Sequence, residues 1–187
     1  MSVFGIKVEY GIGTGQGEES LQSFQIAMER FGQNIENFGE FVFPRVLKLF
    51  ERTVDGQFEA RGRGPVKGLW PPLTANYAHW KEIAFPGKPL LELTGAMREG
   101  LTKSESAFAS REVGKTTLGF GTKAVPYASF HQTGTKTGLK VRPPFDFPSE
   151  FDNELQTEMQ LGVVDAARAA QLDLETDAEK AYWKAKK

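Results

Sequence analysis

The chain contains no cysteine, so disulfides, thiolate nucleophiles and cysteine-ligated zinc or iron–sulfur centres are excluded. It has only two histidines, His79 and His131, and neither has a carboxylate beside it at the spacing of a metal site on a helix. A structural role is the default for both. No uninterrupted apolar run approaches the roughly 18 residues needed to cross a bilayer. We therefore expect no metal, no cofactor and no membrane partner.

The 187 residues, 40% of them hydrophobic and 25% charged, have the composition of an ordinary globular domain. We expect a single domain over residues 1–172, followed by a charged tail or surface helix over residues 173–187. The first ten residues lack the layout of a signal peptide, so we expect synthesis in the cytoplasm.

Charge is unevenly distributed along the chain. Residues 1–145 hold 18 Lys and Arg against 14 Asp and Glu, whereas residues 146–187 hold 5 against 10. A mildly basic body and an acidic C-terminal segment could let neighbouring copies attract each other. A solvated acidic helix is the alternative explanation of the second segment.

Apolar residues at three- and four-residue steps predict amphipathic helices. The expected helices cover residues 18–42, 73–83, 90–101 and 147–170. Pro44 is expected either to kink the first helix or to begin another that continues to about Val54.

Alternating apolar and polar residues predict strands. They occur at residues 4–8, 107–113 and 116–120, and the run 124–130 could pair with the last two. Gly114-Lys115 has the length of a two-residue hairpin turn. We therefore predict an α+β fold in which a small, mostly antiparallel sheet is flanked by a long N-terminal helix, short middle helices and a C-terminal helix.

No catalytic residues are predicted. The closest motif is Gly114-Lys115-Thr116, which ends like a P-loop, but the glycine required five residues before Gly114 is replaced by Ala109. The residues after it predict a strand, where a P-loop requires a helix. A hairpin turn is the favoured interpretation.

An acid-free stretch contains Lys136, Lys140 and Arg142, which could contact a nucleic-acid backbone. The sequence pI of about 6.2 and the lack of a recognition helix argue against nucleic-acid binding as the main function. A basic loop lining a channel through which DNA passes is a milder form of the same idea.

Aromatic, proline and glycine residues follow one another in an unusual order between Gly68 and Phe147. They are Trp70, Pro72, Leu73, Tyr77 and Lys81, then Leu90, Leu91, Thr94 and Gly95, then Tyr127, Ala128, His131, Gln132 and Gly134, and finally Arg142, Pro144 and Phe145. This ordered set resembles the phage virion morphogenesis family, also called the tail completion proteins, a group that includes the G protein of bacteriophage Mu and the tail completion protein of the P2-like phages.

The resemblance implies a structural protein of the virion, not an enzyme. Such a protein would complete the tail or neck at the head–tail junction, as one subunit of a sixfold or twelvefold ring. Its partners would be other copies of itself and other neck, tail or connector proteins. The residues expected to make these interactions are Trp70, Tyr127, His131, Gln132, Lys136, Lys140, Arg142 and Phe145.

Several alternatives stay open at this point. Trp70 and Phe145 could be core residues instead of interface anchors. The chain could also be a DNA-contacting channel or packaging accessory protein, or a small hydrolase that depends on His131.

Overall fold

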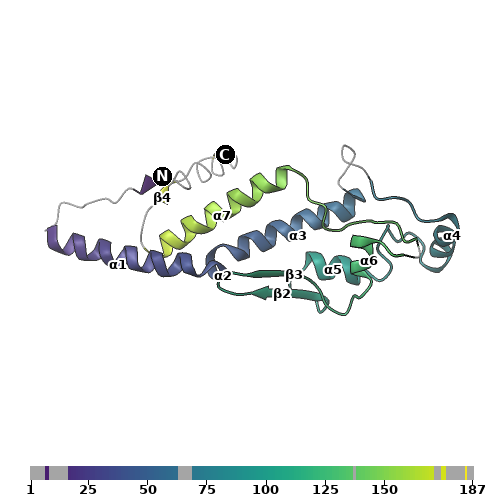
Figure 1. Ribbon diagram of the computed structural model, residues 1–187, viewed down its shortest axis with the longest axis horizontal. Helices are drawn as coiled ribbons and strands as arrows, with labels where there is room; N and C mark the ends of the chain where they lie inside the picture. Colours follow the sequence, from purple (N-terminus) through teal and green to yellow (C-terminus); the bar gives the residue numbers. More distant parts are fainter. Residues whose placement is uncertain are drawn as a thin grey trace. The chain divides into compact units, whose positions relative to one another are not determined.

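The computed structural model describes residues 17–62, 69–136 and 138–170, together with the short pieces 7–8, 174–175 and 184 (Figure 1). These residues form an α+β fold, as the sequence predicts, with seven helices and short antiparallel strand pairs. The elements are β1 (Lys7–Val8), α1 (Gly17–Glu36), α2 (Phe38–Phe41), α3 (Phe43–Ala60), α4 (Ala75–Ala84), α5 (Ala96–Thr102), β2 (Ala109–Val113), β3 (Leu118–Thr122), α6 (Ala128–Thr133), α7 (Glu150–Ala169) and β4 (Leu174–Glu175).

The chain divides into two compact units. The first comprises residues 1–47, 113–118 and 152–187, and the second comprises residues 48–112 and 119–151. Helices α3 and α7 each contribute residues to both units. The single domain over residues 1–172 stays a prediction, and most of the predicted tail lies outside the described residues.

Small side chains allow α1 and α7 to pack closely in the first unit. Ala27, Val164 and Ala167 form a buried cluster, and Phe31 packs against it. The side-chain amide of Asn34 in α1 donates a hydrogen bond to the carbonyl oxygen of Ala166, at 2.8 Å. Because this half-buried amide pairs with one particular carbonyl of α7, it fixes the register of the two helices as well as their separation.

Arg45, near the start of α3, adds two ion pairs within the same unit. Its guanidinium lies 2.6 Å from the carboxylate of Asp165 and 3.2 Å from that of Glu158, both on α7. These two carboxylates are seven residues apart in one helix, so one guanidinium can reach both.

Gly162 in α7 allows a close backbone approach in this unit. A Cβ atom added there would lie 2.8 Å from Cα of Val42 and 2.9 Å from the carbonyl oxygen of Phe41. We expect Gly162→Ala to reduce the free energy of unfolding by about 1–3 kcal/mol, because backbone atoms cannot move aside as side chains do.

The matched control is Gly32→Ala in α1, where an added Cβ would meet nothing within 4 Å. This change should raise the free energy of unfolding by about 0.5–1 kcal/mol, as alanine usually does in a helix. Urea titrations of both variants test the pair. If the free energy of unfolding changed in the same direction in both variants, the close approach at Gly162 would be contradicted.

The first predicted helix is interrupted. A continuous helix over residues 18–42 was expected, but α1 ends at Glu36 and the short α2 follows. Asn37 lies between them with a non-helical backbone (φ −109°, ψ 70°), and its side-chain amide donates to Glu40 at 3.1 Å. Asparagine competes for such local hydrogen bonds, which apolar periodicity does not reveal.

Pro44 is the second residue of α3, so its prediction as the beginning of another helix is confirmed. The missing N–H of proline costs nothing in the first turn of a helix. The helix continues to Ala60, six residues beyond the predicted end at Val54.

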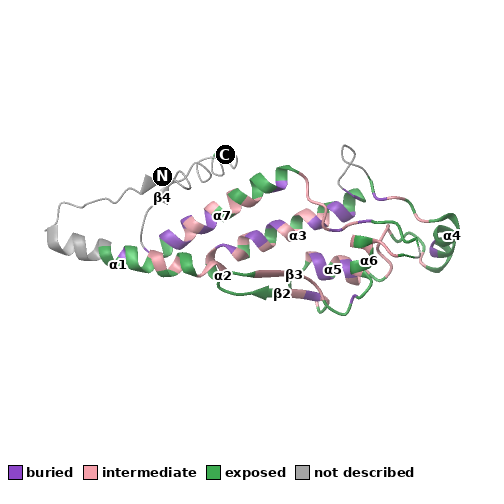
Figure 2. Ribbon diagram, viewed as in Figure 1, coloured by how far each residue is buried: buried purple, intermediate pink, exposed green. Residues whose placement is uncertain are grey.

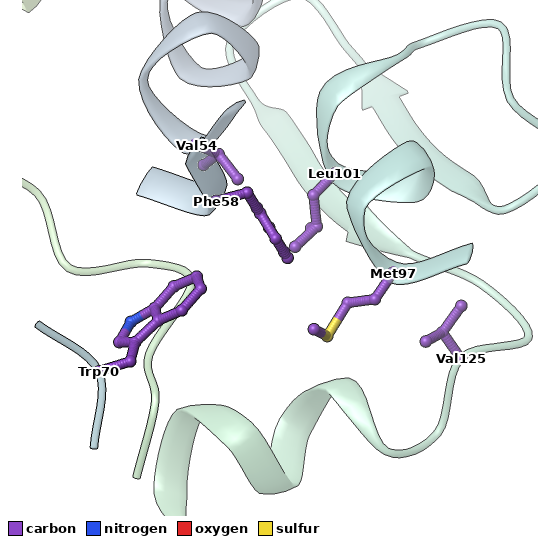
Figure 3. Packing of buried hydrophobic residues seen from close by; sticks show 6 residues of the cluster. All are labelled: Val54, Phe58, Trp70, Met97, Leu101 and Val125. Atoms are coloured by element: carbon purple, nitrogen blue, oxygen red, sulfur yellow. The ribbon is translucent and has the colours of Figure 1, made fainter. Parts of the chain in front are cut away.

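The core of the second unit is a cluster of apolar side chains from α3, α5 and the segments before α4 and α6 (Figure 3). Figure 2 shows buried positions along α3 and α5. Figure 3 shows Val54, Phe58, Trp70, Met97, Leu101 and Val125 pointing toward one another. Phe58 is 1% exposed, and its ring meets the Trp70 indole edge to face with centroids 5.4 Å apart.

A group of phenylalanines extends this core toward β3 and the start of α7. The ring of Phe50 lies 5.4 Å from Phe120, 5.2 Å from Phe147 and 5.1 Å from Phe151. Tilted and edge-to-face pairs of this kind contribute beyond their buried area.

Strands β2 and β3 form the predicted hairpin, with its turn one residue later than expected. The N–H of Gly114 donates to the carbonyl of Thr117 at 2.9 Å, so Lys115 and Thr116 are the central residues of the turn. The predicted pairing of residues 124–130 with this hairpin is wrong, because most of that run belongs to α6 and the turn before it. Pro126 lacks the N–H that a paired strand donates.

Candidate functional site

A pocket of about 540 Å³ opens in the second unit. Its walls come from four segments that are far apart in the sequence. Helix α4 contributes Tyr77 and Lys81, and the segment before α5 contributes Leu91 and neighbouring residues. Tyr127 and His131 at α6, and residues 138–142 after it, complete the lining.

Arg142 fixes the geometry of the pocket from within. It is only 3% exposed, and its guanidinium donates to the carbonyl oxygens of Pro71 (2.7 Å), Pro72 (2.9 Å) and Lys140 (3.3 Å). Its backbone N–H donates to the carbonyl of His131 at 2.9 Å. One side chain therefore joins the segment before α4 to the segment after α6. Burial lowers the pKa of Arg142, and the nearby Tyr77 opposes this effect.

Lys81 is the second buried cation, at 6% exposure. Its ammonium group donates to the carbonyl of Pro89, which holds the turn after α4 against the helix. Burial lowers the pKa of Lys81, and the negative charge of Glu92 partly opposes that change. A lysine this deeply buried departs from the usual exposed placement of the residue.

His131 lies half-buried in the same pocket, close to Arg142. Its Nδ1 is buried and has no hydrogen-bond partner among the described residues. Its ring meets that of Tyr127 edge to face at 6.3 Å. Burial lowers the pKa of His131 from its usual value of 6.5, and the positive charge of Arg142 lowers it further.

The lowered pKa of His131 predicts a pH dependence of stability. Below pH 6.5 the unfolded chain takes up a proton at this residue, whereas the folded chain resists it. The free energy of unfolding should therefore fall as the pH is lowered through this range, and His131→Gln should make the fall shallower. Urea titrations between pH 7 and pH 5 (about the range around the usual histidine pKa) measure the difference. His79→Gln, at an exposed position outside the pocket, is the control. Equal slopes for all three proteins would contradict the prediction.

Exposed apolar side chains, three of them aromatic, form a rim at this pocket, in which Trp80 takes part through its contact with Tyr77. We use the term rim for Tyr77, Trp80, Tyr127 and Leu139, which are 44%, 47%, 40% and 37% exposed. The rings of Tyr77 and Trp80 stack at 5.3 Å. Exposed apolar groups gathered at a hollow are typical of binding surfaces for proteins or ligands.

One wall of the pocket has a strained backbone. Leu91 has a φ of +64°, in the left-handed region that a leucine rarely adopts. The same side chain lines the pocket and packs against the core cluster of the second unit. Strain of this kind persists only where the surrounding structure requires it, and it is frequent at functional sites.

Of the eight predicted interaction residues, Tyr127, His131, Lys140 and Arg142 line this pocket. Gln132 supports it from behind by exchanging two hydrogen bonds of 3.2 Å with the backbone of Phe145. Lys136 is exposed and lies outside the lining.

Trp70 and Phe145 are core residues, the second of the two alternatives left open by the sequence. Trp70 is 7% exposed, and its indole N–H donates to the carbonyl of Pro143 at 3.2 Å. Phe145 packs against the same cluster, with its ring 5.7 Å from Phe120. Their contribution to the pocket is to hold its walls in place.

Sequence reasoning left Leu91, Leu93 and Leu139 out of the interaction residues. Nothing in an apolar periodicity distinguishes a leucine that lines a pocket from one in the core. Tyr77 and Lys81 appeared only among the family-like motifs. The signal that could have singled them out is their spacing of four residues on one helix, which puts both on the same face.

A second hollow in this unit is polar. Four acidic and four basic residues line it, so their charges balance. Arg98 is at its centre and contacts Asp55 at 2.7 Å, Glu92 at 3.0 Å and Glu59 at 3.3 Å. These internal ion pairs explain the cluster as a brace between α3 and the segment around α5.

In the part of the chain that the structure describes, no group of three or more His, Asp or Glu side chains could hold a metal ion. No helix among those residues is long and apolar enough to cross a membrane. The chain matches no protein-family model, and comparisons with curated proteins and with solved structures found no significant similarity.

Proposed function

We propose that this chain is a structural subunit of a tailed-phage virion, located at the head–tail junction, where it completes the tail or neck as part of an oligomeric ring. The observation that carries the proposal is the convergence of the family-like motifs on one pocket. Tyr77, Leu91, Tyr127 and Arg142 come from four different motifs, and all four side chains line that pocket.

Other residues of the same motifs hold the pocket together. Pro72 accepts a hydrogen bond from Arg142, Lys81 donates to the turn after α4, and Gln132 is tied to Phe145. A shared set of motifs that builds one surface is what a family of binding proteins requires. The exposed aromatic rim supports a protein partner, because aromatic side chains are enriched in protein–protein interfaces.

Charge supports assembly into a closed ring. A ring needs two unlike patches on each subunit that recognise each other. The net positive charge of residues 1–145 and the net negative charge of residues 146–187 provide such a difference.

Electron microscopy of lysates from a phage that lacks this gene tests the function. We expect filled heads lying apart from tails, and normal particles when the gene is supplied from a plasmid. The morphology of the free tail ends would show which side of the junction lacks its ring. Intact, infectious particles without the gene would overturn the proposal.

The rival functions predict other results, each with a measurement of its own. A hydrolase that depends on His131 would show an activity that the His131→Gln variant loses, whereas an assembly protein has no such activity in either form. A DNA-contacting channel protein would bind duplex DNA with an affinity that falls steeply as salt is added.

A further inference from the structure

The pocket is positively charged, and its charge is not balanced by its own walls. The described residues that line it include Lys81, Lys140 and Arg142 together with His131, and none of them is an aspartate or glutamate. The polar hollow nearby in the same unit has equal numbers of acids and bases. The imbalance therefore distinguishes this pocket from the polar hollow.

Arg142 differs in this respect from the other arginines whose ion pairs the structure defines. Arg45 faces Asp165, Arg98 faces Asp55 and Arg111 faces Glu51. Arg142 is only 3% exposed, yet its side-chain partners in the described chain are the neutral carbonyls of Pro71, Pro72 and Lys140.

Lys81, which lines the same pocket, is also a buried cation bonded to a neutral group. Its hydrogen-bond partner is the neutral carbonyl of Pro89, and Glu92 acts on it only through the longer-range field, since that carboxylate is hydrogen bonded to Arg98. A buried cation without an adjacent anion is unfavourable, and an anionic ligand would relieve both cations at once.

The remaining walls are apolar. Leu73, Leu91, Leu93 and Leu139 contribute aliphatic surface, and Tyr77 and Tyr127 contribute the faces or edges of their rings. A hollow of about 540 Å³ is larger than one amino-acid side chain needs, so it has room for a short stretch of polypeptide.

We propose that the pocket binds an acidic segment of a partner protein, one in which a carboxylate side chain stands next to a large apolar residue. The carboxylate neutralises the positive charge of Arg142 and Lys81, and the apolar residue packs against the leucine and tyrosine walls. This inference rests on the proposed function, since it names the chemistry by which the junction subunit recognises a neighbouring protein.

The same observations disfavour nucleic acid as the occupant. A phosphate backbone is bound by exposed cations along a track, whereas two of the cations here are buried within apolar walls. A polypeptide segment with an aspartate or glutamate next to a large apolar residue offers both the negative charge and the apolar side chain that the pocket requires.

The test is a selection of random dodecapeptides (about the length that a pocket of this size and its rim can contact) displayed on phage, carried out against the full-length protein. Enriched peptides should contain aspartate or glutamate beside phenylalanine, tyrosine, tryptophan or leucine. A fluorescein-labelled copy of an enriched peptide then gives the Kd by anisotropy. A control peptide with asparagine and glutamine in place of the acidic residues should have a Kd at least about tenfold higher, as expected for the loss of a charged hydrogen bond.

The matched variants are Lys140→Glu and Lys123→Glu. Both lysines are exposed, and both changes reverse one charge, but only Lys140 lines the pocket. We expect Lys140→Glu to weaken binding of the labelled peptide about tenfold and Lys123→Glu to leave it unchanged. Circular dichroism confirms that both variants are folded.

Four results would overturn the inference. They are the absence of any enriched peptide, enrichment of peptides without acids, equal Kd values for the two lysine variants, and displacement of the peptide by a duplex oligonucleotide whose own binding is steeply salt-dependent. Electron microscopy of the lysates that lack the gene tests the proposed function independently of this inference. Heads apart from tails with no peptide binding would remove only the inference, whereas peptide binding with intact particles would remove the proposed function.

Discussion

Phe58→Ala is expected to reduce the free energy of unfolding by about 3–5 kcal/mol. The side chain is 1% exposed and lies at the centre of the core cluster, where it contacts Trp70 edge to face. Removing the ring takes away its buried apolar area, its contact with the indole and the filling of the space between α3 and α5. A small domain has only about 5–15 kcal/mol of stability in total, so this one change should remove a large fraction of it.

Equilibrium unfolding in urea, followed by far-ultraviolet circular dichroism, measures the effect. The control is Phe130→Ala, which removes the same ring from a position that is 50% exposed on α6. That variant should unfold within about 0.5 kcal/mol of the wild type, as surface changes usually do. If Phe58→Ala already unfolds without urea, Phe58→Leu retains part of the volume and should give a measurable, smaller loss. A Phe58→Ala protein as stable as Phe130→Ala would show that the cluster in Figure 3 does not form the core of its unit.

Arg142→Met is expected to reduce the free energy of unfolding by about 2–4 kcal/mol, because each buried polar group left without a partner costs about 1–3 kcal/mol. The carbonyls of Pro71 and Pro72 depend on this guanidinium. Proline has no N–H, so this dipeptide offers acceptors and no donors of its own. Arg142 lies 70 residues further along the chain than Pro72, and it supplies two donors in the planar arrangement that adjacent carbonyls can accept.

Arg142→Lys separates the geometry of the guanidinium from its charge. A lysine keeps the positive charge, but its compact ammonium group cannot reach both proline carbonyls. The Arg142→Lys variant should therefore lose nearly as much free energy of unfolding as Arg142→Met. Lys140→Met removes a charge from the same pocket without breaking a side-chain hydrogen bond and should have little effect. Thermal and urea unfolding of the three variants test this order. Wild-type stability in Arg142→Lys would show that charge alone is required.

The fold class and the long helices were predictable from the sequence, because helix periodicity depends on residues three and four apart. That pattern located most of α1 and most of α7, and Pro44 indicated the beginning of α3 within one residue. The interruption at Asn37 was missed, since it depends on a local side-chain hydrogen bond to Glu40. The prediction of a strand over residues 124–130 was wrong because it relied on the alternation of apolar residues and gave too little weight to Pro126, which cannot donate a hydrogen bond in a strand ladder.

The pocket was only partly predictable. Tyr127, His131, Lys140 and Arg142 were selected as interaction residues, and these four side chains line one surface. The deep burial of Lys81 could not have been foreseen, because it results from the turn at Pro89 folding back onto α4. Sequence patterns record neither such long-range contacts nor which aromatic side chains become buried.

The different surroundings of Trp70 and Trp80 make the protein a natural optical reporter. Trp70 is enclosed in the core with its indole N–H bonded to a carbonyl, so its emission should lie at short wavelength until the second unit unfolds. Trp80 is half exposed and stacks on Tyr77, a residue of the pocket wall. Its emission should respond to whatever occupies the pocket. Once Trp183 is replaced by phenylalanine, the tryptophan fluorescence of the unlabelled protein would report unfolding of the second unit through Trp70 and occupancy of the pocket through Trp80.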